Sequence, residues 1–225
     1  MKGPTNLLAI DTSTNRIAVA LLQFGKQPVV AIKDDGLRHA EYAAELIKKV
    51  VSDAGLMMQE LGGIVCGIGP GPFTGLRVGI VSAQSIGFVL SIPVFGVCSH
   101  DAIAFEYAQQ NPNKDSIVIT DARRKEVYWT KYQGIKRTSS PKVSKLEEVP
   151  TSGVHLLHKP LDPISLAQVA IEAMNRTEKG IEIKSFATDL ATGDGSIVAL
   201  PNQVLLPPIP LYLRKPDALT LAERS

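Results

Sequence analysis

The chain has 225 residues, of which 44% are hydrophobic, so it can bury a core as one large domain or two small ones. Its 24 basic and 22 acidic residues leave a net charge of +2, which is not the electrostatic footprint of a chain that grips nucleic acid by itself. Cys66 and Cys98 lie in apolar, strand-like runs and predict buried, reduced thiols in a cytoplasmic protein rather than a disulfide. Asp11 and Arg16 interrupt the first apolar residues, so we expect no signal peptide, and no uninterrupted apolar run predicts a membrane span.

Strands and helices are predicted to alternate in the first half of the chain. Alternating apolar residues predict a β-hairpin and a third strand, and apolar residues at three- and four-residue spacing predict a helix that Gly55 ends. A short apolar strand, a glycine-rich turn, a second helix, a further strand and a third helix follow. The expected ranges are 6–23 for the hairpin, 29–33, 64–67 and 93–97 for the strands, and 40–54, 75–90 and 99–109 for the helices.

The glycine-rich turn, Gly67–Gly79, is the most informative stretch of the chain. It alternates proline, which fixes φ, with glycine, which permits close approach of the backbone. Thr74 is the expected N-cap of the helix that follows. Such a turn can hold an anion or can be a tight connection without a ligand. No Lys-Ser or Lys-Thr follows the last glycine, so the P-loop interpretation fails, and the dinucleotide-binding spacing is also absent.

The first hairpin has a counterpart in the second half. In both hairpins an aspartate, Asp11 or Asp121, ends the first apolar run, and the next apolar residue, Ile17 or Val127, follows six positions later. Two matching hairpins indicate two related halves. In the second half we expect strands at 117–120 and 126–133, a third strand near 143–146, a helix at 165–178, and irregular structure from Gly180 to Leu211. His155 and His158 are interpreted as surface-loop residues.

These motifs carry a family resemblance. A strand that ends in Asp, a polar turn and a return strand, used twice, resembles the actin, hexokinase and Hsp70-like superfamily. Within it, Ile10–Thr14, Gly67–Gly79, Asp121–Arg123, Glu126–Tyr128 and Pro210–Arg214 together resemble the TsaB family, also called YeaZ. The motifs fall at both ends and in the middle, so the resemblance covers most of the chain.

The resemblance implies an α/β fold of two ribonuclease H-like halves of the actin and Hsp70 type. Each half is expected to be a mixed sheet with helices, the second half being reduced. We expect the first half at 1–103 and the second at 104–208, with 209–225 packing back on the first.

The resemblance also implies a function in making threonylcarbamoyladenosine in tRNA. The chain is expected to be a non-catalytic scaffold that pairs with the TsaD transferase and the TsaE ATPase. Whether it pairs with its own copy when alone is left open, a homodimer being one alternative. It is expected to meet tRNA only indirectly, to need no cofactor, and to act in the cytoplasm away from membranes. A small-molecule kinase of the same superfamily is the second hypothesis, and a metallopeptidase is the third.

The two hairpin turns distinguish the scaffold hypothesis from the kinase hypothesis. Asp11, Thr12 and Ser13 are the candidate nucleotide-binding residues, because the first turn of superfamily members meets nucleotide phosphates. These side chains can equally satisfy their own turn. The second turn, Ala122–Lys125, has no glycine to let phosphate approach backbone amides, so ATP binding and hydrolysis are not expected. Three basic residues there can touch tRNA or simply solvate a hairpin tip.

His39 is the candidate for a metal. The resemblance implies that TsaD carries two histidines four positions apart on its first helix, whereas here Ala43 stands four positions after His39. One imidazole does not replace a metal-binding pair, so we expect no metal and interpret His39 as a solvated residue at the start of a helix.

Small residues repeat every four positions on the second helix and so lie on nearly one face. Each glycine costs roughly 1 kcal/mol of helix propensity, which suggests that a close contact compensates, either with a partner or with the chain's own sheet. Together with the apolar stripe of the first helix they form the expected partner interface. Its residues are His39, Ala43, Leu46, Ile47, Val50, Gly75, Gly79, Ala83 and Gly87.

Overall fold

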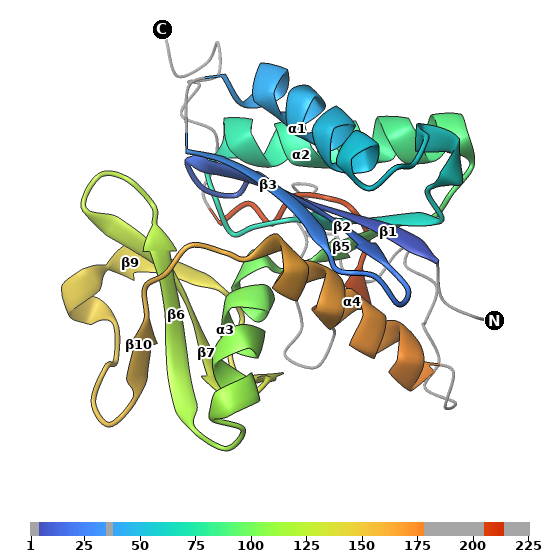
Figure 1. Cartoon of the computed structure of the whole chain (residues 1–225). Coiled ribbons are helices and arrows are strands. Elements are labelled where there is room, and N and C mark those ends of the chain that lie inside the picture. Colours follow the sequence, from blue (N-terminus) through green and yellow to red (C-terminus); the bar gives the residue numbers. More distant parts are fainter. Residues whose placement is uncertain (1–4, 35–37, 178–204, 214–225) are drawn as a thin grey trace, which may run out of the picture.

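Two β-sheets with helices packed on them make up the computed structural model, which describes residues 5–34, 38–177 and 205–213 (Figure 1). The first sheet has six strands in the order β11-β5-β4-β1-β2-β3. β1 pairs antiparallel with β2 and parallel with β4, so the sheet is mixed. The bounds are β1 Asn6–Asp11, β2 Arg16–Gln23, β3 Val29–Asp34, β4 Gly63–Gly67, β5 Val94–Val97 and β11 Leu205–Leu206.

The central strands of the first sheet, β1, β2 and β4, are buried on both faces, whereas the edge strand β3 is mostly exposed. Successive side chains of a strand point to opposite faces, so each strand contributes to two apolar clusters. Leu8 and Ile10 of β1 pack in one apolar cluster with α1 (His39–Asp53) and α2 (Phe73–Leu90). Leu7 and Ala9 of β1 pack in the other cluster. That cluster contains residues of α3 (Ser99–Gln110) and α4 (Pro163–Thr177). The sheet therefore lies between two helical layers (Figure 1).

The second sheet has five strands around the β6–β7 hairpin. β10 pairs parallel with β6, and β7 pairs antiparallel with β6, β8 and β9. Trp129 and its neighbours form a small apolar cluster on one face, while Tyr132 points to the face that α3 covers. The bounds are β6 Asp115–Asp121, β7 Glu126–Gln133, β8 Lys136–Arg137, β9 Lys142–Lys145 and β10 His155–Leu157, with short 3₁₀ turns at Met58–Glu60 and Leu146–Glu148.

This architecture confirms the predicted α/β fold with two mixed sheets, the second one smaller. β11 lies within the range expected for the second half, yet it pairs with β5 of the first sheet. α4 also packs against the first sheet, where Leu166 and Ala170 join the cluster of Leu7. The 103/104 boundary between the halves stays a prediction.

Several local expectations need correction. The second helix begins at Phe73 with Pro72 as its N-cap, so Thr74 lies inside the helix and caps nothing. Cys98 is the N-cap of α3 rather than a strand residue, although both cysteines are free and buried as predicted. His155 belongs to a strand and stacks on Tyr107, 4.9 Å between ring centroids. Strands β8, β10 and β11 were not predicted, and most of the segment expected to be irregular, 180–211, lies outside the described residues.

Within the described residues, α2 is long and apolar enough to cross a membrane by length and composition alone. This differs from the expectation of no such segment. The helix packs its inner face on the first sheet, where Leu76 and Ile80 join the core.

Candidate functional site

The first hairpin turn is closed by its own hydrogen bonds. The Asp11 carboxylate accepts bonds from the backbone N–H and the hydroxyl of Ser13, at 3.0 and 2.8 Å, and from the Ser99 hydroxyl at 2.6 Å. Burial raises the pKa of Asp11, and the bonds from Ser99 and Ser13 oppose that rise. The carboxylate therefore holds the turn together and already has partners on both oxygens.

Thr12 joins this turn to the glycine-rich helix. Its hydroxyl donates to the carbonyl of Gly75 at 2.7 Å and accepts from the N–H of Gly79 at 3.0 Å. Both contacts need the helix backbone close to the turn, and a Cβ on Gly75 would lie 2.6 Å from the Thr12 carbonyl oxygen. The glycines of α2 therefore allow the helix to touch the first turn.

His39 lies at the same junction rather than in solvent. Its side chain is buried, and its Nε2 donates to the carbonyl of Thr14 at 3.0 Å. The expectation of a solvated histidine was wrong because α1 starts directly above the first turn. Ala43, four positions on, is fully buried. Among the described residues no group of three or more His, Cys, Asp and Glu could hold a metal ion.

The second hairpin turn has an unusual backbone. Arg123, Arg124 and Lys125 all have positive φ, at 59°, 54° and 62°. The N–H of Arg123 bonds to the Asp121 carboxylate at 2.8 Å, and the N–H of Glu126 bonds to the carbonyl of Arg123 at 3.0 Å. Left-handed backbone is unfavourable for residues with a Cβ, so this turn stores strain that the first turn does not.

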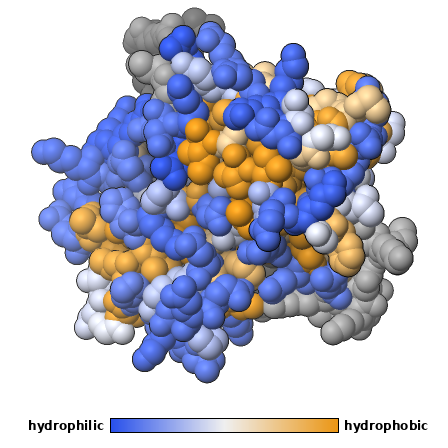
Figure 2. Space-filling model, viewed as in Figure 1, coloured by the Kyte–Doolittle hydropathy of each residue, from blue (hydrophilic) through white to orange (hydrophobic). Residues whose placement is uncertain are grey.

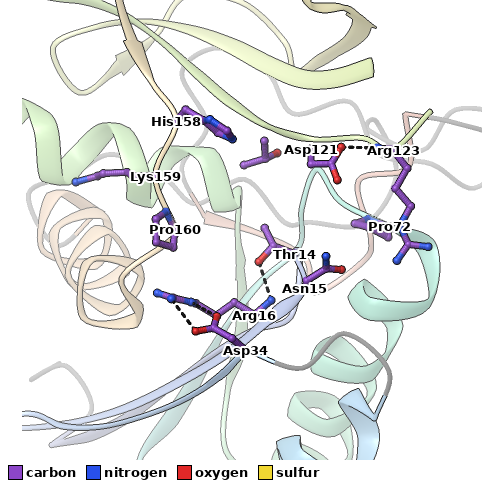
Figure 3. Close-up of a pocket in the computed structure, with 11 residues that line it drawn as sticks. Thr14, Asn15, Arg16, Asp34, Pro72, Asp121, Arg123, His158, Lys159 and Pro160 are labelled. Atoms are coloured by element: carbon purple, nitrogen blue, oxygen red, sulfur yellow. Dashed lines mark hydrogen bonds and ion pairs between the residues drawn. The ribbon is translucent and has the colours of Figure 1, made fainter. Parts of the chain in front are cut away.

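A cavity of about 270 Å³ lies between the two turns (Figure 3). Thr14, Asn15 and Arg16 line it from the first turn, and Asp121 and Arg123 line it from the second. The other lining residues are Asp34, Pro72, Thr120, His158, Lys159 and Pro160.

Most charges around this cavity already have partners. Arg16 binds Asp34 through two nitrogens, at 2.7 and 3.0 Å, and this bond lowers the pKa of Asp34. Lys159 forms an ion pair with Glu106 of α3. The cavity between the hairpins is lined by a mixture of polar and apolar groups. The candidate nucleotide-binding residues Asp11, Thr12 and Ser13 do not line this cavity.

The start of α3 bonds to both sheets. Ser99 bonds to Asp11 of the first sheet, while the buried ring of His100 lies 2.9 Å from the Thr120 hydroxyl and 2.8 Å from that of Thr130. Burial, with a smaller contribution from Arg137, lowers the pKa of His100 to about 3, so the ring is neutral.

Asp101 is the third residue at the start of α3 that joins the two sheets. It accepts bonds from Tyr132 at 2.7 Å and from Arg137 at 3.0 Å. Sequence reasoning did not single out His100 or Asp101, because a polar helix start looks the same whether it is capped by solvent or by a second sheet.

All nine residues of the expected partner interface are buried within the chain. Leu46, Ile47 and Val50 pack in the core, and Gly87 faces Val94 of β5. The small-residue face therefore contacts the chain's own sheet, which was the alternative weighed above. In this structure these nine residues are therefore not accessible to a partner.

The opposite face of α2 is the exposed one. Phe88 and Val89 are 87% and 77% exposed, and Val81 is 54% exposed. The outer face of α1 is mostly polar, with Glu45 and Lys48 exposed. On the face shown in Figure 2, hydrophilic side chains surround a further apolar area. A surface with several exposed large apolar side chains on one helix is typical of a protein–protein contact.

Two sheets, each with a hairpin whose first strand ends in an aspartate, define the ribonuclease H-like class in its two-half, actin and Hsp70-type arrangement. The family model of TsaD, tRNA N6-adenosine threonylcarbamoyltransferase, matches residues 25–188.

Similarity to three proteins identifies a family within this class. An uncharacterised protein of Mycobacterium tuberculosis is 34% identical over 221 residues, which are 97% of this chain and 96% of that protein. The tRNA threonylcarbamoyladenosine biosynthesis protein TsaB of Buchnera aphidicola is 30% identical over 63% of this chain and 71% of that protein. The solved structure of YeaZ from Pseudomonas aeruginosa superposes with a TM-score of 0.69 at 27% identity, over 77% of this chain and 94% of that one. The chain belongs to the TsaB (YeaZ) family, and thereby to a pathway of tRNA threonylcarbamoyladenosine biosynthesis.

Proposed function

We propose that this chain is a non-catalytic subunit of the machinery that makes threonylcarbamoyladenosine in tRNA. It would pair with a TsaD-type transferase and act together with a TsaE-type ATPase. Its membership of the TsaB family is the observation that carries the proposal. The free, buried cysteines fit a location in the cytoplasm, where we place this activity.

The closed first turn supports a non-catalytic role. A nucleotide-dependent enzyme of this fold needs groups at the turns that can turn toward phosphate or metal. Here both Asp11 oxygens accept hydrogen bonds from Ser13 and Ser99, and the Thr12 hydroxyl bonds to α2. The second turn offers arginine and lysine side chains but no glycine through which a phosphate could approach the backbone.

The exposed face of α2 is the surface we assign to the TsaD-type partner. Val81, Phe88 and Val89 would be buried there, each apolar side chain contributing about 1.5–3 kcal/mol when fully removed from water. Because the TsaD family model also matches this chain, the partner shares its fold and can present the equivalent helices. A contact between related surfaces also explains a homodimer when the partner is absent, since an isologous contact needs only self-complementarity.

Mixing experiments with purified TsaD from the same host test this assignment. We expect Val81→Glu/Phe88→Glu to abolish the heterodimer in native mass spectrometry while leaving the melting temperature within a few degrees. Phe24→Glu is the matched control, because Phe24 is 95% exposed at the β2–β3 turn, and it should pair normally. A Val81→Glu/Phe88→Glu variant that still pairs would exclude this face.

A further inference from the structure

The β6–β7 turn places three cationic side chains in a backbone conformation that disfavours them. Arg123, Arg124 and Lys125 are exposed and all lie in the left-handed region. Two other hairpin turns of the described chain place glycine at positive φ, namely Gly25 at 74° and Gly134 at 56°, and the β1–β2 turn has no residue at positive φ. Glycine would relieve the strain here as well. Strain of this kind clusters where a side chain is needed for binding.

The left-handed run also arranges the side chains. In helical backbone, with about 3.6 residues per helical turn, successive side chains point roughly 100° apart. The three cations therefore spread around the tip instead of alternating across the hairpin. The tip is held in place by the bond from Arg123 N–H to Asp121 and by the bond from the Ala122 N–H to the carbonyl of Glu126, at 3.0 Å. The buried Ala122 side chain anchors it further. The turn is therefore a cationic projection that hydrogen bonds hold in this conformation.

The chain around the turn is also rich in basic residues. Eight Lys and Arg residues but only one Glu lie between residues 123 and 145, although Arg137 is buried and pairs with Asp101, and Lys145 pairs with Glu147. At the adjacent cavity, Asp34 and Glu106 pair with Arg16 and Lys159, and Asp121 accepts the N–H of Arg123. Lysines on the edge strand β9 are explained by protection of a sheet edge, so the inference depends on the turn alone.

We propose that the Arg123–Lys125 turn contacts the phosphate backbone of RNA directly. Exposed Arg and Lys side chains bind nucleic acid largely through its phosphates, and such contacts position a partner without reading its sequence. The turn carries no apolar side chain, whereas binding to a membrane surface combines cations with inserted apolar groups. The inference rests on the proposed function in that it takes tRNA as the RNA at hand. It adds a direct local contact to the expectation, drawn from a net charge of +2, that this chain meets tRNA only indirectly.

The experiment measures binding of a fluorescent, unmodified tRNA transcript to the full-length chain by anisotropy between 50 and 200 mM salt. We expect Arg124→Glu/Lys125→Glu to weaken binding at least about tenfold and to lower the slope of log affinity against log salt by about 2. Lys26→Glu/Lys114→Glu is the matched control, with the same change in charge at two exposed residues of other turns, and should stay within about twofold.

Three outcomes would overturn the proposal: no salt-dependent binding of tRNA by the wild-type chain, an equal loss in the control, or binding of phosphatidylserine vesicles in preference to tRNA. Native mass spectrometry with TsaD separates this proposal from the previous one. The turn variant should pair with TsaD normally, so loss of RNA binding with pairing intact concerns the turn alone. Loss of pairing in the α2 variant leaves the RNA measurement on the isolated chain unaffected.

Discussion

Gly79 shows how a single residue sets the distance between the first hairpin turn and α2. Its N–H donates to the Thr12 hydroxyl, and a Cβ at this position would collide with the same oxygen. Thr12 has no room to yield, because its hydroxyl also donates to the carbonyl of Gly75. The low helix propensity of glycine is thus compensated inside the chain.

We predict that Gly79→Ala destabilises the protein by about 1–3 kcal/mol, the usual range for overpacking a core. Helix propensity alone would give the opposite sign, a gain of about 1 kcal/mol. Ser85→Ala, on the exposed side of the same helix, should change the stability by less than about 0.5 kcal/mol. Urea titration of both variants decides the matter, and a stabilised Gly79→Ala would contradict the packing described.

The hydrogen bonds of Asp11 lead to a prediction about nucleotide. Because Ser13 and Ser99 occupy both carboxylate oxygens, the isolated chain should not hydrolyse ATP and should bind it with a dissociation constant above about 1 mM. Calorimetric titration with ATP and magnesium checks this. Low-micromolar binding with turnover would favour the kinase hypothesis.

At the scale of elements, the start of α3 is the joint between the two sheets. Ser99, His100 and Asp101 are consecutive, and they bond respectively to β1, to the β6–β7 pair, and to β7 with β8. Breaking one of these buried contacts leaves a polar group without a partner, at a cost of about 1–3 kcal/mol. The joint therefore holds the two sheets in one arrangement.

This joint predicts a pH dependence. His100 is neutral in the folded chain down to a pKa of about 3, whereas the unfolded chain binds a proton near pH 6.5. Between these values the unfolded state binds more protons, so stability falls as pH falls, by up to about 1.4 kcal/mol per pH unit. The raised pKa values of Asp11 and Asp101 act in the opposite direction as pH approaches 3.8.

Thermal unfolding between pH 7 and pH 4 measures this effect. His100→Gln keeps hydrogen-bonding groups near Thr120 and Thr130 but does not titrate. Its melting temperature should be lower at pH 7 and should fall less steeply toward pH 4 than that of the wild type. Equal slopes of melting temperature against pH for the two proteins would show that His100 does not cause the loss of stability at low pH.

The strained β6–β7 turn leads to a prediction in which stability and RNA binding change in opposite directions. Lys125→Gly removes a Cβ from a residue at φ 62°, which should stabilise the protein by about 1 kcal/mol. The same change should weaken RNA binding, because one cation is lost. A melting curve and an anisotropy titration of this variant belong together. A variant that is less stable than the wild type would contradict the strained geometry.

Sequence patterns predicted the elements whose signal is local. The two hairpins and the four helices follow from apolar periodicity and differ from the structure by a few residues at their ends. Strands of two or three residues, such as β8 and β11, are too short to carry a period and form because a neighbouring strand offers partners. The direction in which the α2 glycines face could not be predicted, since a small-residue stripe serves a partner and an internal sheet equally well.

At the scale of the whole molecule, the first sheet has helices on both faces, and the outer side of α2 is exposed. α4 and α3 cover one face, and α1 and α2 cover the other. The outer side of α2 carries the most exposed apolar side chains of the described helices, while the basic β6–β7 turn belongs to the second sheet. The proposed partner surface and the cationic tip thus lie over different sheets, as the proposed role of a subunit that contacts two other molecules requires.

The most direct test of this account is the threonylcarbamoyladenosine content of tRNA in cells of the native host. The chain is depleted, and nucleosides from total tRNA are measured by mass spectrometry after complementation with the wild-type chain, with Val81→Glu/Phe88→Glu or with Phe24→Glu. We predict that the modification is lost on depletion, restored by the wild type and by Phe24→Glu, and not restored by the α2 variant. Unchanged threonylcarbamoyladenosine after depletion would contradict the proposed function, and full restoration by the α2 variant would contradict the surface assigned to the partner.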